Sequence, residues 1–580
     1  MIKPYLFTLF FISVFSISYG QEQKSLPHTL SESEKSILQN YQFRSSTIAT
    51  PPPSTAVRAA AEWEEVEYLV ITWASDKKGI LKQIVAAAVN ECKVIITTQD
   101  QSTVAAYLTA AGIPLTNVIF MNAPWNSIWI RDYAGNTVYS NDVGDRALVD
   151  WIYNRPRPND DLMPVSHATI TGIPLFRTIS GTTDLVNTGG NFMSDGMGTA
   201  FASALILNEN ETGNPYGVSI KTETQIDGIM QDYMGINRFI KMNTLPYDQI
   251  HHIDMHMKLL DEETILVSKY PTGVADGPQI EANINYVLNT YQSPFGTPYK
   301  IKWMMAPPSS AGDYPDANGS YRTFTNAVFI NKSIIIPTYR PEVDTPAIAQ
   351  WKALMPGYNI VGIDVDDPGE NLIGSLGAIH CITHTIGVEN PLWIVHQPIA
   401  YVAPGTSVSV KAQIKHNSNI NQAKVFYRAS GTTNFLEASM SLTNNDNWTA
   451  NIITPTDGKD VEYYIWAKAN SGKTLTRPIV APQGYWTMNN SALSINKFEE
   501  SNITGPFPNP TTTDVSFTFS QLTGKIQISI HNLLGQKLFE TEVESSIGTF
   551  TLPLDSQWKG TLVITFKSGA HIAYKKIIKY

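Results

Sequence analysis

Cysteine is nearly absent from this chain, which has only Cys92 and Cys381 among its 580 residues. Two cysteines cannot build a disulfide-dense scaffold or a cysteine-based zinc module. Charged residues are also scarce, at 16%, well under the usual quarter. The net charge of −10 argues against a nucleic-acid partner, because such a protein needs a basic patch to neutralise phosphates.

Long hydrophobic runs are equally rare, apart from one at the N-terminus. Lys3 precedes an apolar run over residues 5–17, and Ser18-Tyr19-Gly20 has the small residues of a cleavage site. This pattern predicts a secretory signal peptide over residues 1–20. The alternative, a membrane anchor, is disfavoured because the run is short and lacks a stop-transfer flank. We therefore expect an exported protein without a transmembrane segment.

The chain is too long for one hydrophobic core, and its texture changes along the sequence. The 43% hydrophobic share is enough for packed cores, which excludes disorder throughout. We expect five parts: a signal peptide (1–20), a pro-segment or linker (21–57), an α/β domain (58–395), an immunoglobulin-like β-sandwich (396–490) and an all-β C-terminal unit (497–580).

The α/β assignment depends on strands and helices that alternate. Residues 68–73 and 93–96 are short apolar runs, and residues 80–89 between them have a helical pattern. Such alternation is typical of an α/β domain. Residues 264–267 and 333–336 resemble each other, which hints at internal repetition.

The C-terminal half loses the helical pattern. Residues 408–410, 423–427 and 461–466 alternate apolar and polar side chains and are separated by Asn/Gly/Asp turns. This is typical of a small immunoglobulin-like sandwich. After Lys497, further strands are expected over residues 515–519 and 525–530.

The first candidate cluster is Trp129-Ile130-Arg131-Asp132-Tyr133. It follows a strand-like apolar stretch, and strand ends are where α/β enzymes place functional groups. The alternative is that Arg131 and Asp132 form a structural ion pair.

The second cluster is His251-His252-Ile253-Asp254-Met255-His256. If this segment is a strand, His252, Asp254 and His256 share one face. They could then bind a metal ion or perform general acid/base catalysis. The alternative is a polar strand end.

The third cluster surrounds Cys381, in Gly374-Ser375-Leu376-Gly377-Ala378-Ile379-His380-Cys381-Ile382-Thr383-His384. A cysteine flanked by histidines is a candidate nucleophile, and the glycines allow close approach of a substrate to the backbone. The alternatives are an inert buried thiol or a disulfide to Cys92.

Together, Asp132, His252, Asp254 and Cys381 occur in an order that resembles the guanidine-modifying deiminases of the pentein superfamily. The resemblance is greatest to bacterial peptidylarginine deiminases and their agmatine deiminase relatives. Supporting segments are Ala61-Glu62-Trp63-Glu64, Gly189-Gly190-Asn191-Phe192-Met193-Ser194-Asp195-Gly196 and Thr325-Asn326. The resemblance covers the whole α/β domain and implies a five-bladed α/β propeller with a central site.

The resemblance also implies a reaction, the hydrolysis of a guanidinium to a urea and ammonia. Asp132 and Asp254 would clamp the flat cation, since carboxylates accept its forked N–H donors. Cys381, with its pKa lowered by cationic surroundings, would attack the guanidinium carbon. His252 would act as general acid and then general base. Asn326 would support the cysteine or the substrate.

Further substrate contacts are expected at Trp129, and more weakly at Asn191 and Asp195. The resemblance implies no cofactor and no metal, including no dependence on calcium.

Substrate choice is expected to depend on the segment Trp151-Ile152-Tyr153-Asn154-Arg155-Pro156-Arg157-Pro158. It resembles the segment that holds the carboxylate of a C-terminal arginine in bacterial peptidylarginine deiminases. Prolines stiffen it toward an extended shape, and two guanidinium groups suit a carboxylate. The alternative is a basic surface loop. Agmatine has no carboxylate, so peptides or proteins with arginine are the favoured substrates.

The C-terminal unit also has a family resemblance. Phe507-Pro508-Asn509-Pro510, Asn532-Leu533-Leu534-Gly535-Gln536 and Tyr574-Lys575-Lys576-Ile577-Ile578 resemble a sorting domain of the type IX secretion system. This resemblance implies the secretion machinery as a partner and a secreted or cell-surface location. The alternative is an ordinary β-rich binding module.

Four functions therefore compete. The leading one is an exported deiminase of peptidyl arginine, with an agmatine deiminase-like hydrolase as the alternative within the same chemistry. A metallohydrolase using His252, Asp254 and His256 is a different enzyme class. A non-catalytic surface adhesin is the third class, although retention of all four candidate catalytic residues argues against it.

Overall fold

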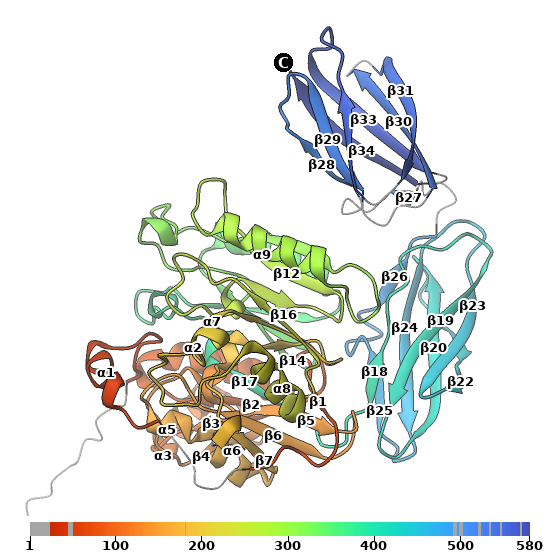
Figure 1. Ribbon diagram of the computed structural model, residues 1–580. Helices are drawn as coiled ribbons and strands as arrows, with labels where there is room; N and C mark the ends of the chain where they lie inside the picture. Colours follow the sequence, from red (N-terminus) through yellow and green to blue (C-terminus); the bar gives the residue numbers. More distant parts are fainter. Residues whose placement is uncertain are drawn as a thin grey trace, which may run out of the picture.

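The structure, a computed structural model, describes most of the chain after the predicted signal peptide, which itself lies outside the described residues. The described ranges are 24–43, 50–179, 181–490, 496–497, 503–519, 524–532, 535–545, 548–568 and 571–580. Within these ranges, none of the helices combines the length and the apolar character needed to cross a bilayer. Figure 1 shows an α/β region followed by two β-rich units.

Residues 57–387 form five separate sheets, which confirms the α/β class. The first holds β1 (Val57–Ala59), β5 (Asn136–Ser140), β6 (Arg146–Trp151) and β7 (Leu175–Thr178); the second β8 (Met193–Ser194), β9 (Thr199–Ser203) and β10 (Arg238–Met242); the third β11 (Met257–Leu259), β12 (Thr264–Lys269) and β13 (Lys300–Met305); the fourth β14 (Val328–Ile330), β15 (Ser333–Thr338) and β16 (Asn359–Asp364); the fifth β2 (Val66–Thr72), β3 (Lys93–Thr97), β4 (Val118–Met121) and β17 (His384–Gly387). No sheet closes on itself, and the five-bladed propeller stays a prediction.

The five sheets repeat one plan. In each, an antiparallel pair of strands is followed by a strand that is added in parallel: β5–β6 then β7, β8–β9 then β10, β11–β12 then β13, β14–β15 then β16, and β17–β2 then β3. A parallel partner requires a crossover, and helices supply it. The two similar segments in the sequence, 264–267 and 333–336, are β12 and β15, the central strands of their sheets.

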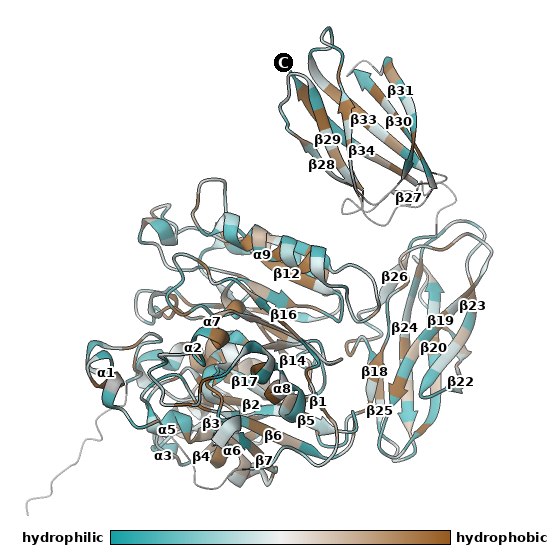
Figure 2. Cartoon of the chain, viewed as in Figure 1, coloured by the Kyte–Doolittle hydropathy of each residue, from teal (hydrophilic) through white to brown (hydrophobic). Residues whose placement is uncertain are grey.

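The helices lie against the sheets, and the longer ones carry both hydrophobic and hydrophilic residues (Figure 2). Their bounds are α2 (Lys78–Ala88), α3 (Gln101–Ala110), α4 (Ile130–Tyr133), α5 (Pro158–Asp161), α6 (Met163–Thr171), α7 (Leu205–Asn208), α8 (Glu223–Met234), α9 (Gly277–Thr290) and α10 (Pro341–Leu354). In α2 the buried residues Ile80, Leu81, Ile84, Val85 and Ala88 lie on one face, as the helical spacing predicts.

The fifth sheet joins the two ends of the α/β region. β17, its last strand, pairs antiparallel with β2, so Thr385 lies opposite Leu69. Leu69 is fully buried, as are most residues of β2. The segment just before β17, which contains Cys381, is therefore held against the first core strands of the chain.

The next unit is a β-sandwich with a core of its own. One sheet holds β18 (Trp393–Val395), β19 (Ser407–Lys415), β23 (Asn447–Ile453) and β22 (Ser441–Asn444); the other holds β21 (Leu436–Ser439), β20 (Ile420–Ala429), β24 (Val461–Ala469), β25 (Thr474–Arg477) and β26 (Trp486–Met488). We assigned residues 393–395 to the α/β domain, but β18 pairs with β19 and belongs to the sandwich.

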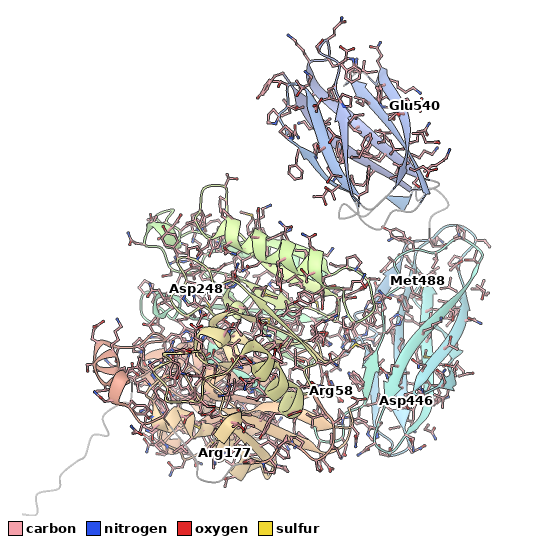
Figure 3. The ribbon with its side chains drawn as sticks, in the orientation of Figure 1. Arg58, Arg177, Asp248, Asp446, Met488 and Glu540 are labelled. Carbon is pink, nitrogen blue, oxygen red and sulfur yellow. The ribbon has the colours of Figure 1, made fainter. Side chains whose placement is uncertain are left out.

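The sandwich rests against the α/β region through charged and aromatic groups. The Arg58 guanidinium lies 4.2 Å from the centre of the Trp393 ring (Arg58 is labelled in Figure 3). Arg477 forms an ion pair with Glu262 at 3.0 Å, and Lys473 forms one with Glu65 at 2.8 Å.

The C-terminal unit is a second pair of sheets around an apolar core. One contains β27 (Asn496–Lys497), β34 (His571–Lys579), β33 (Gly560–Ser568), β30 (Gly524–Asn532) and β31 (Lys537–Ser545); the other contains β28 (Ile503–Phe507), β29 (Asp514–Phe519) and β32 (Gly548–Pro553). The strands expected over 515–519 and 525–530 are β29 and β30.

Residues 24–43, called the N-terminal segment below, were expected to be part of a pro-segment or linker. They contain α1 (Glu32–Ile37), which begins with a capping box between Ser31 and Glu34. His28 in this segment is fully buried against the α/β region. The segment is thus packed, unlike a free linker.

Candidate active site

The candidate site residues come from equivalent places in the five sheets. Asp132, Asn191, Asp254, Asn326 and Cys381 each lie two to four residues before the first strand of an antiparallel pair: β5, β8, β11, β14 and β17 respectively. Loops at the same edge of repeated units are positioned alike, which brings residues far apart in the sequence to one place.

Cys381 is a buried thiol surrounded by polar groups. It lies in the turn His380–Ile382 and is fully buried. Its Sγ lies 3.6 Å from Asp254 Oδ2, and Asn326 donates from Nδ2 to Sγ at 3.3 Å. Asn326 also accepts the His380 backbone N–H at 2.9 Å, so it fixes the turn that carries the thiol.

The thiol is protonated in this state. Burial raises the pKa of Cys381 well above its usual value, and the charges of Asp254 and Asp132 raise it further. We expected a pKa lowered by cationic surroundings, and this was wrong for the protein without substrate. Burial and two neighbouring carboxylates both oppose a thiolate in this state.

Asp132 and His252 form the opposite wall. Asp132 Oδ1 lies 3.4 Å from His252 Nδ1, and the Thr188 hydroxyl lies 3.0 Å from His252 Nε2. Burial lowers the pKa of His252 to about 4, so the ring is neutral at pH 7. Burial favours the neutral form of Asp132, but interactions with His252 and His28 outweigh it and bring the pKa of Asp132 to about 2.

The close packing of backbone against Asp132 and His252 depends on Gly190. A Cβ on Gly190 would lie 2.6 Å from His252 Nδ1 and 2.9 Å from Asp132 Oδ1, both closer than atoms of a real side chain approach. Gly190 therefore allows the backbone to lie directly against these two groups.

A second buried network supports Asp254. His380 has Nδ1 2.7 Å from Asp254 Oδ2 and Nε2 2.5 Å from Glu62 Oε1. Glu62 also pairs with Arg131 at 3.0 Å and with Lys258. Burial raises the pKa of Asp254, but the His380 hydrogen bond outweighs it, and the net pKa is lowered.

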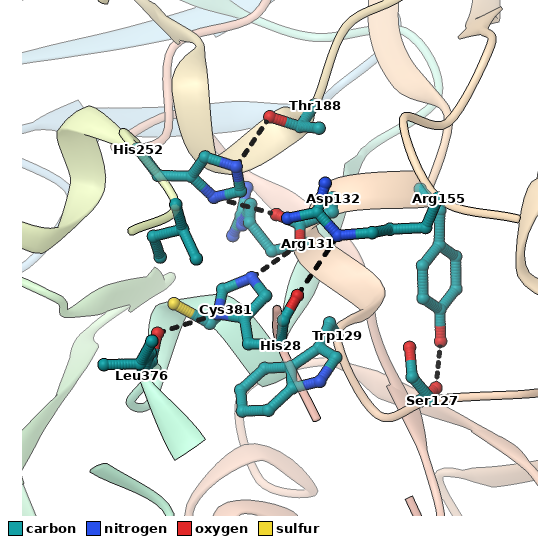
Figure 4. A network of polar contacts seen from close by, with 12 residues as sticks. His28, Ser127, Trp129, Arg131, Asp132, Arg155, Thr188, His252, Leu376 and Cys381 are labelled. Atoms are coloured by element: carbon teal, nitrogen blue, oxygen red, sulfur yellow. Dashed lines mark hydrogen bonds and ion pairs between the residues drawn. The ribbon is translucent and has the colours of Figure 1, made fainter. Parts of the chain in front are cut away.

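His28 of the N-terminal segment occupies the space between these walls (Figure 4). Its Nε2 lies 2.7 Å from Asp132 Oδ2, and its Nδ1 lies 2.8 Å from the Leu376 carbonyl oxygen. The ring stacks on Trp129, with centroids 4.2 Å apart and planes 10° apart. Trp129 thus faces His28, and its Nε1 donates to Leu26 O at 3.0 Å; a contact of Trp129 with substrate stays a prediction.

Arg155 and Arg157 are both buried, which excludes a basic surface loop. The segment is not extended as expected, because the Arg157 N–H donates to Arg155 O at 2.8 Å and closes a turn. Arg157 pairs with Glu34 at 2.7 Å, and Arg155 donates to His28 O at 3.2 Å. Both arginines therefore bind the N-terminal segment.

Asn191 and Asp195 have hydrogen-bond partners in the backbone of β9 and of the turn before it, and their role in substrate binding stays a prediction. Asn191 exchanges hydrogen bonds with the backbone of Ser203, which ties its turn to β9. Asp195 accepts the N–H groups of Met197 and Thr199 and so closes the β8–β9 hairpin. Asn and Asp often make such turn contacts, and their presence in a motif does not separate this role from substrate binding.

The local structure around two clusters also differs from expectation. Residues 130–133 form α4, one helical turn, and Ile253–Met255 form a 3-10 turn after His251, whose φ is +58°. The alternation expected of a strand therefore does not apply to His252, Asp254 and His256. Three polar residues at alternate positions are too few to define a period that distinguishes a strand from a turn.

A metal site would need different ligands from the expected His252, Asp254 and His256. In the described part of the chain, the group that could hold an ion is His28, Asp132 and His252, whose ligand atoms lie within 4.8 Å of one another. His256 is outside it. The expected alternative of a Cys92–Cys381 disulfide is also wrong, since both cysteines are free.

The sequence did not point to three residues that line or support the candidate site: Glu62, His380 and His28. Glu62 and His380 stood inside motifs that were noted, but no spacing indicated that one would bridge to the other. His28 lay in a polar segment with no motif at all. The signal that could have marked it is Ser31 with Glu34, an N-terminal capping pattern, because it indicates a structured rather than a free segment.

Comparison with known proteins adds the family. Residues 58–386 match the Porphyromonas-type peptidyl-arginine deiminases, and residues 506–580 match the secretion system C-terminal sorting domain. A Shewanella frigidimarina protein named "Putative agmatine deiminase" is 23% identical over 60% of this chain and 98% of its own length. One of the same name from Streptococcus mutans is 25% identical over 46% of this chain and 76% of its own.

Among solved structures, the agmatine deiminase of C. jejuni is similar, with a TM-score of 0.47 and 20% identity over 59% of this chain and 99% of that one. The sorting domain indicates export by the type IX system to the cell surface or the medium. Because the first match spans more than half of the 580 residues, the chain belongs to the Porphyromonas-type peptidyl-arginine deiminase family, a family of hydrolases that act on guanidino C–N bonds.

Proposed function

We propose that this protein is an exported protein-arginine deiminase that converts peptidyl arginine, preferably at a C-terminus, to citrulline and ammonia. The observation that carries this proposal is the Cys381 thiol beside two buried carboxylates, Asp254 and Asp132. A guanidinium between these carboxylates would satisfy both with its N–H donors. Its positive charge would also favour the thiolate.

The residues support a covalent route. The Cys381 proton passes to neutral His252, and the thiolate Sγ forms a bond to the guanidinium carbon. The C–N bond then breaks, and ammonia leaves with the proton from His252. Water, deprotonated by His252, attacks the thiouronium carbon, the C–S bond breaks, and the sulfur leaves as thiolate. The sum is one guanidinium and one water converted to a urea and ammonium.

Arg155 and Arg157 support the preference for a C-terminal arginine. Arg157 is fully buried, and its side chain meets Glu34 and the carbonyls of Pro27 and Thr29, all of the N-terminal segment. A guanidinium that pairs with a carboxylate there is suited to a substrate carboxylate. Agmatine is the second candidate substrate, because curated relatives carry the name agmatine deiminase.

The proposal includes the organisation of the whole chain. A signal peptide (residues 1–20) would direct the first step of export, and the type IX machinery would recognise the sorting domain. The five repeated sheets, each contributing one loop, support a five-bladed propeller around the site. The domain borders given above, the immunoglobulin-like identity of the sandwich, and catalysis without a cofactor or a metal ion are further parts of the proposal.

A substrate panel tests the function. The full chain carrying His28→Ala, which empties the space beside Trp129, is assayed with a peptide ending in arginine, its amide, internal arginine, free arginine and agmatine. We expect the highest kcat/KM for the free C-terminal arginine and a loss of at least tenfold for the amide. Cys381→Ala should abolish turnover with the fold intact. Agmatine as the best substrate would overturn the specificity.

A chelator distinguishes a metal-dependent hydrolase from the proposed cysteine-dependent reaction. Metal-dependent chemistry at His28, Asp132 and His252 would be lost on chelation and accompanied by stoichiometric metal in the purified protein. We expect ammonia release to be unchanged by the chelator.

A further inference from the structure

The N-terminal segment is bound in the candidate site like a ligand. We propose that residues 24–43 are an intramolecular inhibitor peptide, with His28 in the place of the arginine head group and Glu34 in the place of the substrate carboxylate. The identity of the mimicked groups rests on the proposed function. The occlusion of Cys381 does not, because it follows from packing alone.

His28 resembles a guanidinium in shape and charge. Its two ring nitrogens face the oxygens of Asp132 and Leu376 at 2.7 and 2.8 Å. A carbonyl oxygen and an ionised carboxylate can only accept, so both nitrogens donate and the ring is a flat cation. Its stacking on Trp129 is the arrangement that planar cations favour on an indole.

The backbone around His28 is held as a bound peptide is held. Leu26 donates to Asn126 O at 3.2 Å and accepts from Trp129 Nε1 at 3.0 Å. The carbonyls of Pro27 and Thr29, which flank His28, accept from Arg157 at 2.6 and 3.1 Å. Main-chain contacts of this kind bind a chain without reading its sequence, so the same wall suits a substrate peptide.

Glu34 supplies the second side-chain contact. Its carboxylate lies 2.7 Å from Arg157 Nε, with both side chains buried. The capping box fixes the position of Glu34, since the Ser31 N–H donates to its carboxylate at 2.7 Å. The segment therefore presents a flat cation and a carboxylate at once, the two charges of a C-terminal arginine.

Occlusion follows from burial. Cys381, His252, Asp254 and His28 all have an exposed fraction of 0%, so no substrate reaches the thiol while His28 is in place. The segment is connected to the rest of the chain only through residues 44–49. A single proteolytic cut there would turn an intramolecular inhibitor into a dissociable one, because the effective concentration that tethering provides is lost.

Alkylation of Cys381 by iodoacetamide tests the occlusion without relying on any enzymatic activity. In the full chain we expect His28→Ala to raise the alkylation rate of Cys381, followed by mass spectrometry, at least tenfold. Cys92, which is buried directly before β3, should keep its rate and serves as the internal control. Ser33→Ala, at an exposed position of α1 in the same segment, is the matched control and should change nothing.

A second measurement covers the case in which His28→Ala fails to fold. A protease site replaces residues 44–49 in the otherwise full chain, and the chain is cut after folding. On dilution we expect Cys381 to become reactive as the segment dissociates. A synthetic peptide of residues 24–43 should restore protection, and the same peptide with His28→Ala should not.

The outcomes separate the two proposals. Faster alkylation without turnover of any guanidine would support the inhibitor and refute the proposed function. Full turnover by the unmodified chain, with Cys381 equally reactive before and after the cut, would refute the inhibitor and leave the function standing. Protection by both peptides would refute the role of His28 as the mimic of the head group.

Discussion

The His380 ring nitrogen Nδ1 lies 2.7 Å from Asp254 Oδ2. His380 directly precedes Cys381, and the thiol of Cys381 contacts the same carboxylate oxygen. The same ring reaches Glu62 with its other nitrogen. His380 therefore favours the ionised form of Asp254 and fixes its orientation. In the proposed reaction, His380 is a positioning residue.

Replacing His380 by Asn should lower kcat by about two orders of magnitude, because positioning errors near 1 Å cost that much. The pKa of Asp254 should also rise, since burial would act without the opposing hydrogen bond. The acid limb of the kcat/KM profile should then move to higher pH, which a structural role alone would not produce. His384→Gln is the control, because His384 Nε2 bonds to the Gly135 carbonyl; an equal shift in that variant would contradict the assignment.

Gly190→Ala should reduce turnover at least a hundredfold. The added methyl would meet His252 Nδ1 at 2.6 Å and Asp132 Oδ1 at 2.9 Å, so one of these groups must move. Gly228→Ala in α8 is the matched control: its Cβ meets nothing within 4 Å, and alanine is favoured in a helix by about 1 kcal/mol. Activity and melting temperature are measured for both, and equal activity of the two variants would refute the packing argument.

The reactivity of Cys381 should depend on pH in an unusual way for a nucleophile. Since burial and the charges of Asp254 and Asp132 raise its pKa, alkylation in His28→Ala should rise steadily up to pH 9 without a plateau. A free thiol such as glutathione levels off above its pKa of about 8.5. Alkylation is measured with and without a guanidine ligand, which should accelerate it at pH 7. A plateau near pH 7 in the ligand-free protein would contradict a thiol held protonated.

His167 should make the α/β region sensitive to acid. Both of its ring nitrogens are buried without a hydrogen-bond partner, and burial lowers its pKa to about 4. Between pH 6.5 and 4 the unfolded chain binds a proton that the folded one does not, so stability is lost as the pH falls. Relative to pH 7, this costs about 2 kcal/mol at pH 5.

His167→Leu should remove this loss. The measurement is the melting temperature at pH 7 and pH 5, and the difference between the two should be smaller in the variant. His531→Leu, in the C-terminal unit, is the control. If His167→Leu and the unmodified protein lose stability equally on acidification, His167 does not titrate as its surroundings require.

The sequence predicted several strands and most of the residues around Cys381. It did not predict that the N-terminal segment covers them. The strands near residues 68, 93, 264 and 333 were found because apolar runs bounded by polar residues have a clear physical cause. Asp132, His252, Asp254 and Cys381 were candidates from local clusters, and a family resemblance combined them and added Asn326. These residues lie in equivalent loops, and their catalytic roles stay a prediction. The alternation argument at His252 failed, since three residues cannot define a period.

What the sequence could not show are contacts between distant segments. His28 and Asp132 are 104 positions apart and His380 and Glu62 are 318 apart, and no local pattern specifies such pairs. The protonated state of Cys381 also depends on which charges surround it in space. Asn191 and Asp195 have side chains that suit a site and a turn equally, and their bonds to Ser203 and Thr199 were likewise not visible in the sequence.

The pairing of β17 with β2 has a consequence for the order of events during synthesis and export. In a chain that emerges N-terminus first, Asp132, His252 and Asp254 appear long before Cys381. The site therefore stays incomplete until β17 has paired with β2, more than three hundred residues further along the chain. A partly translocated chain would have no thiol beside Asp254.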